Sequence, residues 1–354
     1  MLTEASLGIS GGSQDNFASQ LALSGDTLLA TAPRYFDGAV VVATRSGSSW
    51  SSSQFLTPSG AGGGGKNYAG AVAISGSNAV VAGLPNGTNV TNWTFSRTGL
   101  NWFPQGAGIM PASAHDTGIV LPRSLAMDGN NYVTGGWYGA SVYATTGGQP
   151  VNLLPSDFTP APGDGVFGGQ VAISGSTALV SGGLYDTQAQ LAHWGYVYVK
   201  SGSAWTQQAR LVPSDLASNS GPAFRFNVAI DGDTAVLAST FGAYVFTRSG
   251  TSWSQTQKIA PVTTGAPFGT AVAVSGNLLA IGGGSETGAA GQVYVFGRSK
   301  NTWLLGPTLS TGAPADGFGL SLALSQGTLV VGAPSKSPTT GSSTGAAYIY
   351  TCSP

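Results

Sequence analysis

The sequence predicts an all-β protein built from one repeated unit, and three observations support this. The phrase FGLSLALSQGTLVVGAP at 318–334 recurs with variations, and its versions start near 17, 68, 121, 167, 224, 268 and 318. Each version contains short strand-like segments separated by Gly-containing turns. No stretch carries a sustained helical pattern. A strand-based repeat of roughly 50 residues predicts a seven-bladed β-propeller with four-stranded blades, so that residues 1–354 form a single domain.

The first two segments of each repeat are expected to form the inner strands of a blade. The first, for example VAISG at 72–76, alternates Val or Ile with Ala, so that both faces are apolar, as in a strand buried on both sides. The dipeptides SG, DG and GN that follow are signals for two-residue hairpin turns. The second segment, such as TLLATAP at 27–33, is a continuous apolar run.

The third and fourth segments are progressively more polar, which is expected toward the outside of a blade. The third alternates aromatic and small residues, as in GAYVFTRSG at 242–250. The fourth is mostly polar with one aromatic residue, as in TSWSQTQKIAP at 251–261. The recurrence of tryptophan at this position makes it part of the repeat architecture, and the residues concerned are Trp50, Trp102, Trp205, Trp253 and Trp303.

The seventh repeat supplies only three strands, because it is followed by GAAYIYTCSP at 345–354. The segment before the first repeat, residues 1–13, resembles the fourth strands, with Leu2 and Leu7 where other repeats have apolar residues. We therefore expect this N-terminal segment to complete the last blade. Such a closed ring leaves no sheet edge exposed between the first and last blades.

Charge and hydropathy exclude two classes of partner. The net charge is −1, only 8% of the residues are charged, and the 13 Lys and Arg residues are spread along the chain. Nucleic acids and anionic membranes both need concentrated positive charge, so neither is an expected partner.

No run approaches the roughly 18 apolar residues of a membrane span. The first ten residues lack a signal-peptide pattern. We expect a secreted or cell-surface protein whose signal peptide is not present in this sequence.

The repeats resemble FG-GAP repeats, the propeller repeats of integrin α-subunit heads. The phrase at 318–334 is the fullest match, those at 17–33 and 167–183 are close, and repeats three and five lack the GAP segment. The resemblance covers essentially the whole chain and implies the propeller fold. Integrin-type repeats often bind calcium, but the nearest loops, Asp231–Thr234 and Met127–Asn131, lack the alternating oxygen ligands that calcium needs. No cofactor and no metal site are therefore expected.

Catalytic motifs are not convincing in this sequence. GISGG at 8–12 matches G-x-S-x-G, but a nucleophile elbow needs a strand-to-helix turn. The two histidines, His115 and His193, do not have metal-ligand spacing. No catalytic residue is assigned, and we expect that the protein is not an enzyme. A propeller hydrolase or lyase is the least favoured alternative.

Aromatic residues that do not recur indicate a ligand-binding face. The loops from strand two to three and from strand four to the next blade emerge on one face of a propeller, and several of them carry aromatic and polar residues. Such rings and polar groups suit sugars, bound by these loops or between blades. The predicted ligand-binding residues are Arg34, Tyr35, Asp37, Trp137, Tyr138, Tyr185, Asp186, His193 and Trp194. The alternative, weighed evenly, is that these rings pack their own loops against the blade ends.

The loop NGTNVTNWT contains three overlapping N-x-T sequons, which makes Asn86, Asn89 and Asn92 candidate glycosylation sites in an extracellular setting. Together these features favour a non-enzymatic, lectin-like carbohydrate-binding protein whose partners are glycans or glycoproteins. The integrin resemblance suggests an alternative, a protein-binding adhesion module with cell-surface proteins as partners.

Overall fold

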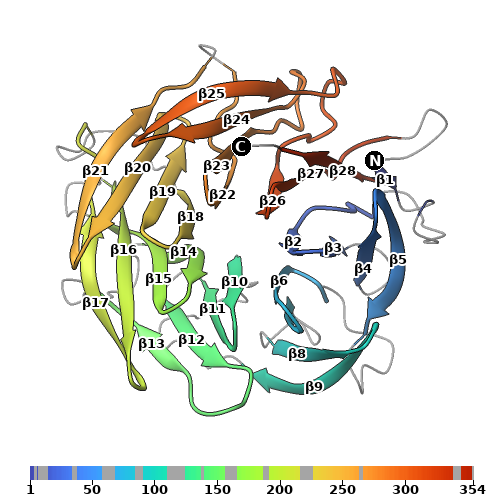
Figure 1. Cartoon of the computed structure of the whole chain (residues 1–354), viewed down its shortest axis with the longest axis horizontal. Coiled ribbons are helices and arrows are strands. Elements are labelled where there is room, and N and C mark those ends of the chain that lie inside the picture. The colour runs from blue at the N-terminus through green and yellow to red at the C-terminus, as the bar shows by residue number, and fades with distance from the viewer. Residues whose placement is uncertain are drawn as a thin grey trace.

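The computed structural model places the chain in a ring of seven four-stranded antiparallel sheets, which confirms the predicted propeller (Figure 1). The structure describes residues 1–3, 6, 15–33, 38–57, 68–83, 91–109, 124–136, 139–155, 166–185, 191–215, 226–262, 266–337 and 344–352. We number the blades in chain order, with blade 1 beginning at β2. In blades 1 to 6 the strands run outward from the axis in sequence order, and in blade 7 the outer strand is the N-terminal one.

The bounds of the strands are as follows. Blade 1 contains β2 (Leu21–Ser24), β3 (Thr27–Ala32), β4 (Ala39–Ser46) and β5 (Ser49–Leu56). Blade 2 contains β6 (Ala71–Ser75), β7 (Asn78–Gly83), β8 (Thr91–Thr98) and β9 (Asn101–Ile109). Blade 3 contains β10 (Ser124–Asp128), β11 (Asn131–Gly135), β12 (Ala140–Ala144) and β13 (Val151–Leu153). Blade 4 contains β14 (Val166–Ser174), β15 (Thr177–Tyr185), β16 (Leu191–Ser201) and β17 (Ala204–Leu211).

The remaining blades follow the same plan. Blade 5 contains β18 (Asn227–Asp231), β19 (Thr234–Ser239), β20 (Gly242–Ser249) and β21 (Ser252–Ile259). Blade 6 contains β22 (Ala271–Ser275), β23 (Leu278–Gly283), β24 (Gln292–Ser299) and β25 (Thr302–Leu309). Blade 7 contains β26 (Ser321–Ser325), β27 (Thr328–Ala333), β28 (Ala346–Thr351) and, as its outer strand, β1 (Leu2–Thr3).

Two ends of the ring can be distinguished by their connections. We call the end with the tight turns between first and second strands, and between third and fourth strands, the turn face. The opposite end is the loop face. The hairpin prediction for the turn face holds: Ser75 pairs with Asn78, and Gly76 between them has φ 57°, a conformation that glycine adopts without strain.

The core lies between neighbouring blades. Between blades 1 and 2, for example, Leu29, Val40 and Val42 pack against Tyr68 and Val81. Comparable apolar clusters lie between blades 3 and 4, 4 and 5, 5 and 6, 6 and 7, and 7 and 1. Because most blades bury both faces in this way, the apolar first and second strands are explained by their position in the ring.

A buried ring precedes the first strand in most blades. The ring often meets an aromatic residue of the third strand, as Phe318 meets Tyr348 with ring centres 5.3 Å apart and planes at 76°. In blade 5 the ring belongs to Phe226, two residues after the predicted repeat start near 224. The equivalent buried rings are Phe17, Tyr68, Phe167, Phe268 and Phe318.

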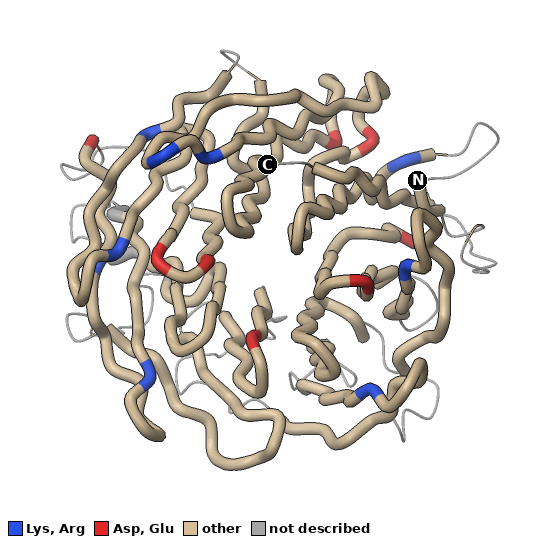
Figure 2. Tube along the Cα trace, viewed as in Figure 1, with Lys and Arg blue, Asp and Glu red and all other residues tan. Residues whose placement is uncertain are grey.

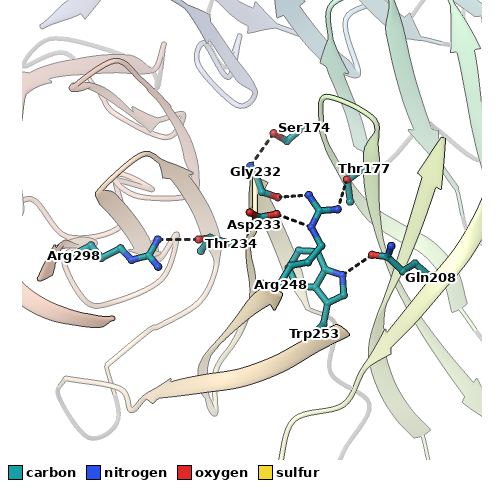
Figure 3. Close-up of polar contacts among 9 residues, drawn as sticks. All are labelled: Ser174, Thr177, Gln208, Gly232, Asp233, Thr234, Arg248, Trp253 and Arg298. Atoms are coloured by element: carbon teal, nitrogen blue, oxygen red, sulfur yellow. Dashed lines mark hydrogen bonds and ion pairs between the residues drawn. The ribbon is translucent and has the colours of Figure 1, made fainter. Parts of the chain in front are cut away.

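The fourth-strand tryptophans take part in a recurring contact between blades (Figure 3). The guanidinium carbon of Arg248 lies 5.2 Å from the ring centre of Trp253, and its Nη1 donates to Thr177 Oγ1 of the preceding blade at 2.9 Å. We call this contact the cation bridge. It recurs from Arg45 to Thr328, from Arg97 to Thr27 and from Arg298 to Thr234, and Lys200 donates to Asn131 in the same way.

A second recurring contact explains the repeated SG and DG dipeptides. The Ser or Asp at the end of a first strand accepts a hydrogen bond from the turn glycine N–H of the following blade. Ser174 Oγ, for example, accepts from Gly232 N at 3.0 Å (Figure 3). The same contact links Ser325 to Gly25, Ser24 to Gly76, Ser75 to Gly129, Asp128 to Gly175 and Asp231 to Gly276.

Closure of the ring by the N-terminal segment is also confirmed. Strand β1 pairs antiparallel with β28, with Leu2 opposite Ala347 and Thr3 opposite Ala346. Most of the predicted closing segment 1–13, Leu7 included, lies outside the described residues. Side chains contribute to closure too, because Ser321 Oγ of blade 7 donates to Ala18 O at 2.6 Å.

Candidate functional site at the junction of blades 2 and 3

Most of the residues predicted to bind ligand lie outside the described part of the chain. This applies to Arg34, Tyr35, Asp37, Trp137, Tyr138 and Asp186, and to the sequon residues Asn86 and Asn89. For Tyr185, at the end of β15, only the backbone is described. His193 and Trp194 lie on β16, opposite Gly183 and Gly182 of β15, near the loop face of blade 4.

The described contacts of Trp194 are packing contacts. Its half-buried ring lies against the apolar cluster between blades 3 and 4. On its other side, the guanidinium carbon of Arg210 lies 4.6 Å from the ring centre. His193 next to it is buried. These contacts are of the kind expected by the packing alternative, and a ligand-binding role for the two residues stays a prediction.

A different part of the loop face departs from the repeat. Equivalent positions in the blades are found by counting residues of the second strand from the tight turn that precedes it. The fourth residue of the second strand and its partner on the third strand are apolar in six blades: Ala30 and Val41, Val81 and Trp93, Val180 and Tyr196, Leu237 and Tyr244, Ile281 and Tyr294, and Val331 and Tyr348. In blade 3 the two residues are Thr134 and Ser141.

Blade 2 presents a polar residue to this part of blade 3. Asn92 occupies the third-strand position that holds Val40 in blade 1 and Val293 in blade 6. Val40 packs toward the following blade, so the equivalent Asn92 is directed toward blade 3. The Asn92 side chain is 0% exposed and lies close enough to Tyr132 of blade 3 to lower the pKa of its hydroxyl.

Several buried polar atoms at this junction form no well-aligned hydrogen bond with the described residues. They are Asn92 Nδ2 and Oδ1, Thr134 Oγ1 and Tyr143 Oη. Asn92 lies near the Tyr132 hydroxyl and Thr134 near the Tyr143 hydroxyl, close enough to lower the pKa of each tyrosine. Asn92 and Thr134 both lie within two residues of the loop-face end of their strands. A buried polar group without a partner costs about 1–3 kcal/mol. Several such groups in one place therefore leave hydrogen-bonding capacity that water or a ligand can use.

Two tyrosines of blade 3 form the aromatic part of the junction. The rings of Tyr132 and Tyr143 are stacked, with centres 5.0 Å apart and planes at 7°. Burial raises the pKa of both hydroxyls, and the proximity of Tyr143 raises that of Tyr132 further. The two hydroxyls therefore stay protonated at neutral pH and are available as hydrogen-bond donors.

A polar row connects the buried groups with the surface. Thr134 pairs with Ser141, and Ser141 pairs with the exposed Asn152 of β13. The Ser141 hydroxyl donates to Asn152 Oδ1 at 2.8 Å. Across blade 3, this row runs outward from a buried hydroxyl to an exposed amide. No Lys, Arg, Asp or Glu is among these groups, and the charged residues in the described part of the chain are scattered around the ring (Figure 2).

The junction, which we call the polar junction, is defined by Asn92, Tyr132, Thr134, Ser141 and Tyr143. Its amide and hydroxyls can donate and accept hydrogen bonds without carrying charge. Sequence reasoning missed it because none of these residues is unusual by itself. Asn92 was noticed only as a sequon. Its side chain is buried between the blades, and glycosylation at this sequon stays a prediction.

A family comparison identifies the repeats. Segments 205–250 and 308–350 match a family model described as FG-GAP repeat. The chain is a propeller with FG-GAP repeats. The first matching segment includes most of blade 5, whose repeat lacks the GAP segment, so the remaining strand pattern is enough for the match. Among curated proteins, none matches the sequence.

Solved structures similar to this FG-GAP propeller share its fold at low sequence identity. A protein of Lactobacillus plantarum has a TM-score of 0.54 and 13% identity, covering 83% of this chain and 84% of that one. The periplasmic gluconolactonase PpgL of Pseudomonas aeruginosa has a TM-score of 0.53 and 12% identity, covering 84% and 86%. The β-propeller domain of the Trilobed protease of Pyrococcus furiosus has a TM-score of 0.52 and 9% identity, covering 88% and 90%.

The gluconolactonase corrects one prediction. The expectation that the protein is not an enzyme is wrong as an exclusion, because a propeller that matches most of this chain is an enzyme. Identities this low establish the shared fold alone, and a propeller fold is compatible with enzymes and binding proteins alike. Within the described residues, no helix is long and apolar enough to cross a membrane, and no group of three or more His, Cys, Asp or Glu residues could hold a metal ion.

Proposed function

We propose that this FG-GAP propeller binds carbohydrate, and that hydroxyls of an uncharged sugar enter between blades 2 and 3 at the polar junction. The observation that carries the proposal is the group of buried Asn92 and Thr134 polar atoms that form no well-aligned hydrogen bond with the described residues. Glycans or glycoproteins outside the cell, or at its surface, are the partners that follow from this ligand class.

The chemistry of the junction favours a sugar over other small ligands. A carboxamide can donate to one ligand hydroxyl and accept from another, and the Ser and Thr hydroxyls do both. Neutral groups cannot compensate a buried charge, whose transfer from water is costly unless it is paired. The described polar junction contains no charged side chain. We therefore expect neutral sugars to bind and the corresponding uronic acids or sulfated sugars to bind much more weakly.

A glycan array with three proteins tests the proposal: the wild type, Asn92→Val and Trp194→Ala. Valine is the residue that blades 1 and 6 carry at the position of Asn92. The expected result is binding of neutral glycans by the wild type, loss of binding by at least about tenfold in Asn92→Val, and retention in Trp194→Ala. A tenfold loss of affinity corresponds to about 1.4 kcal/mol, which we expect for losing the buried hydrogen bonds between the Asn92 side chain and the sugar.

The other outcomes each contradict a part of the proposal. Failure of folded wild type to bind any glycan would overturn carbohydrate binding. Loss in Trp194→Ala with retention in Asn92→Val would place the site at blade 4, as the sequence predicted. Turnover of a bound sugar or lactone would make the protein an enzyme that uses the same junction, and binding of a glycoprotein after complete deglycosylation would favour the adhesion alternative.

A further inference from the structure

We propose that the junction of blades 2 and 3 is the joint at which the ring opens, that it is hinged at the turn face, and that ligand binding at the polar junction closes it. The claim that ligand binding closes the joint rests on the proposed function. The claim that the ring opens at this joint without ligand rests only on the contacts between the blades.

The turn-face end of the joint is well connected by hydrogen bonds. Ser75 Oγ accepts from Gly129 N at 2.8 Å and donates to Asp128 Oδ1 at 3.4 Å. Asn78 Nδ2 donates to Asn130 Oδ1 at 2.9 Å. These three bonds join the tight turn of blade 2 with the tight turn of blade 3. They hold the turns together, and because they lie at one end of the strands they leave rotation about that end free.

This interface lacks two contacts that hold other blades together. The apolar clusters found at the other six interfaces have no counterpart here among the described residues, although Val80 and Ala82 of blade 2 and Tyr132 of blade 3 are buried. At the turn face, the cation bridge is missing too. At the position of Arg45 and Arg248, blade 3 carries Thr145, whose hydroxyl reaches Asn130 of its own turn at 3.5 Å. Blade 7 carries Cys352 there, but its interface with blade 6 has an apolar cluster.

The cost of opening should therefore be lowest at this joint. Separating two apolar faces costs about 25 cal/mol for each Å² of apolar surface that becomes exposed to water. Separating blades 2 and 3 at the loop face instead lets water reach Asn92 and Thr134, whose buried polar atoms form no well-aligned hydrogen bond with the described residues. A ligand that hydrogen-bonds both Asn92 of blade 2 and Thr134 of blade 3 joins the two faces, so it stabilises the closed ring.

Native-state hydrogen exchange followed by mass spectrometry on the full chain tests this inference. Local opening is expected to make peptides from β8, β11 and β12 exchange at least about tenfold faster than the matched peptides from β20, β23 and β24. Asn92→Val with Thr134→Val, which restores the residue types of other blades, should slow exchange in β8 and β11 without ligand. A glycan selected on the array should slow it in the wild type.

The outcomes separate this inference from the proposed function. If exchange is equally slow in all blades, with or without the double substitution, the claim that the ring opens at this joint is wrong even if glycans bind. Fast exchange at the joint in a protein that binds no glycan would overturn carbohydrate binding and leave the joint in place. Glycan binding that leaves exchange in β8 and β11 unchanged would overturn ligand-driven closure.

Discussion

At the scale of single residues, two buried threonines have opposite roles. Thr31 and Thr134 are both 0% exposed. The Thr31 hydroxyl accepts from Gln20 N at 3.0 Å and bonds Ser19 Oγ at 2.9 Å, whereas that of Thr134 lies near the Tyr143 hydroxyl but forms no well-aligned hydrogen bond with the described residues. Thr31→Val should lower the free energy of unfolding by about 1–3 kcal/mol, because the Gln20 N–H loses its partner. Thr134→Val should raise it by up to about 1 kcal/mol.

Urea unfolding of both variants measures these changes. Destabilisation by Thr134→Val equal to that of Thr31→Val would mean that the Thr134 hydroxyl has a structural partner, which would remove the basis of the polar junction. If Thr134→Val is more stable than the wild type but binds no sugar, Thr134 is retained for function and not for stability. The sequence could not distinguish the two threonines, since each lies in an apolar run and only the register between strands shows what its hydroxyl meets.

At the scale of elements, the cation bridge should contribute more to stability than the exposed ion pair that the same arginine makes. Arg248 stacks on Trp253 and donates to Thr177 across the interface, and it also pairs with the largely exposed Asp233 at 2.6 Å. Arg248→Met should cost about 1–3 kcal/mol, because a hydrogen bond to a charged group and a cation–π contact are both lost. Asp233→Asn removes only an exposed pair and should cost less than about 1 kcal/mol.

Denaturant midpoints of the two variants, compared at equal m-values, check this difference. Equal costs would show that the ion pair and not the bridge joins blades 4 and 5. The sequence predicted the elements of this contact only in part. Trp253 was assigned to the repeat, and the DG at Asp231–Gly232 was assigned to a turn. That the same Asp231 also accepts from Gly276 of the next blade depends on the curvature of the ring, which no single repeat contains.

At the scale of the whole molecule, the number of blades and the closure follow from the sequence, because both depend on counting repeats. The polar junction does not, because it is a relation between two blades that are separately unremarkable: Asn92 of β8 faces residues more than thirty positions later on β11 and β12. The sequence also pointed to the loop face as the ligand-binding face, and that role stays a prediction. The particular residues on it were recognisable only once the strands had been aligned in space.

Alkaline pH should unfold the ring, because burial raises the pKa of Tyr68, Tyr132, Tyr143, Tyr244, Tyr348 and Tyr350. Below the unfolded-state pKa of about 10 these hydroxyls are neutral in both states and stability is unaffected. Above it the unfolded chain loses protons that the folded chain keeps, so the free energy of unfolding falls as pH rises. Tyrosinate absorbance should therefore increase together with loss of fold, whereas in concentrated urea the same tyrosines should titrate near pH 10. Full titration near that pH with the native ring intact would show that these hydroxyls are accessible to water, and would argue against the tightly packed blade interfaces described above.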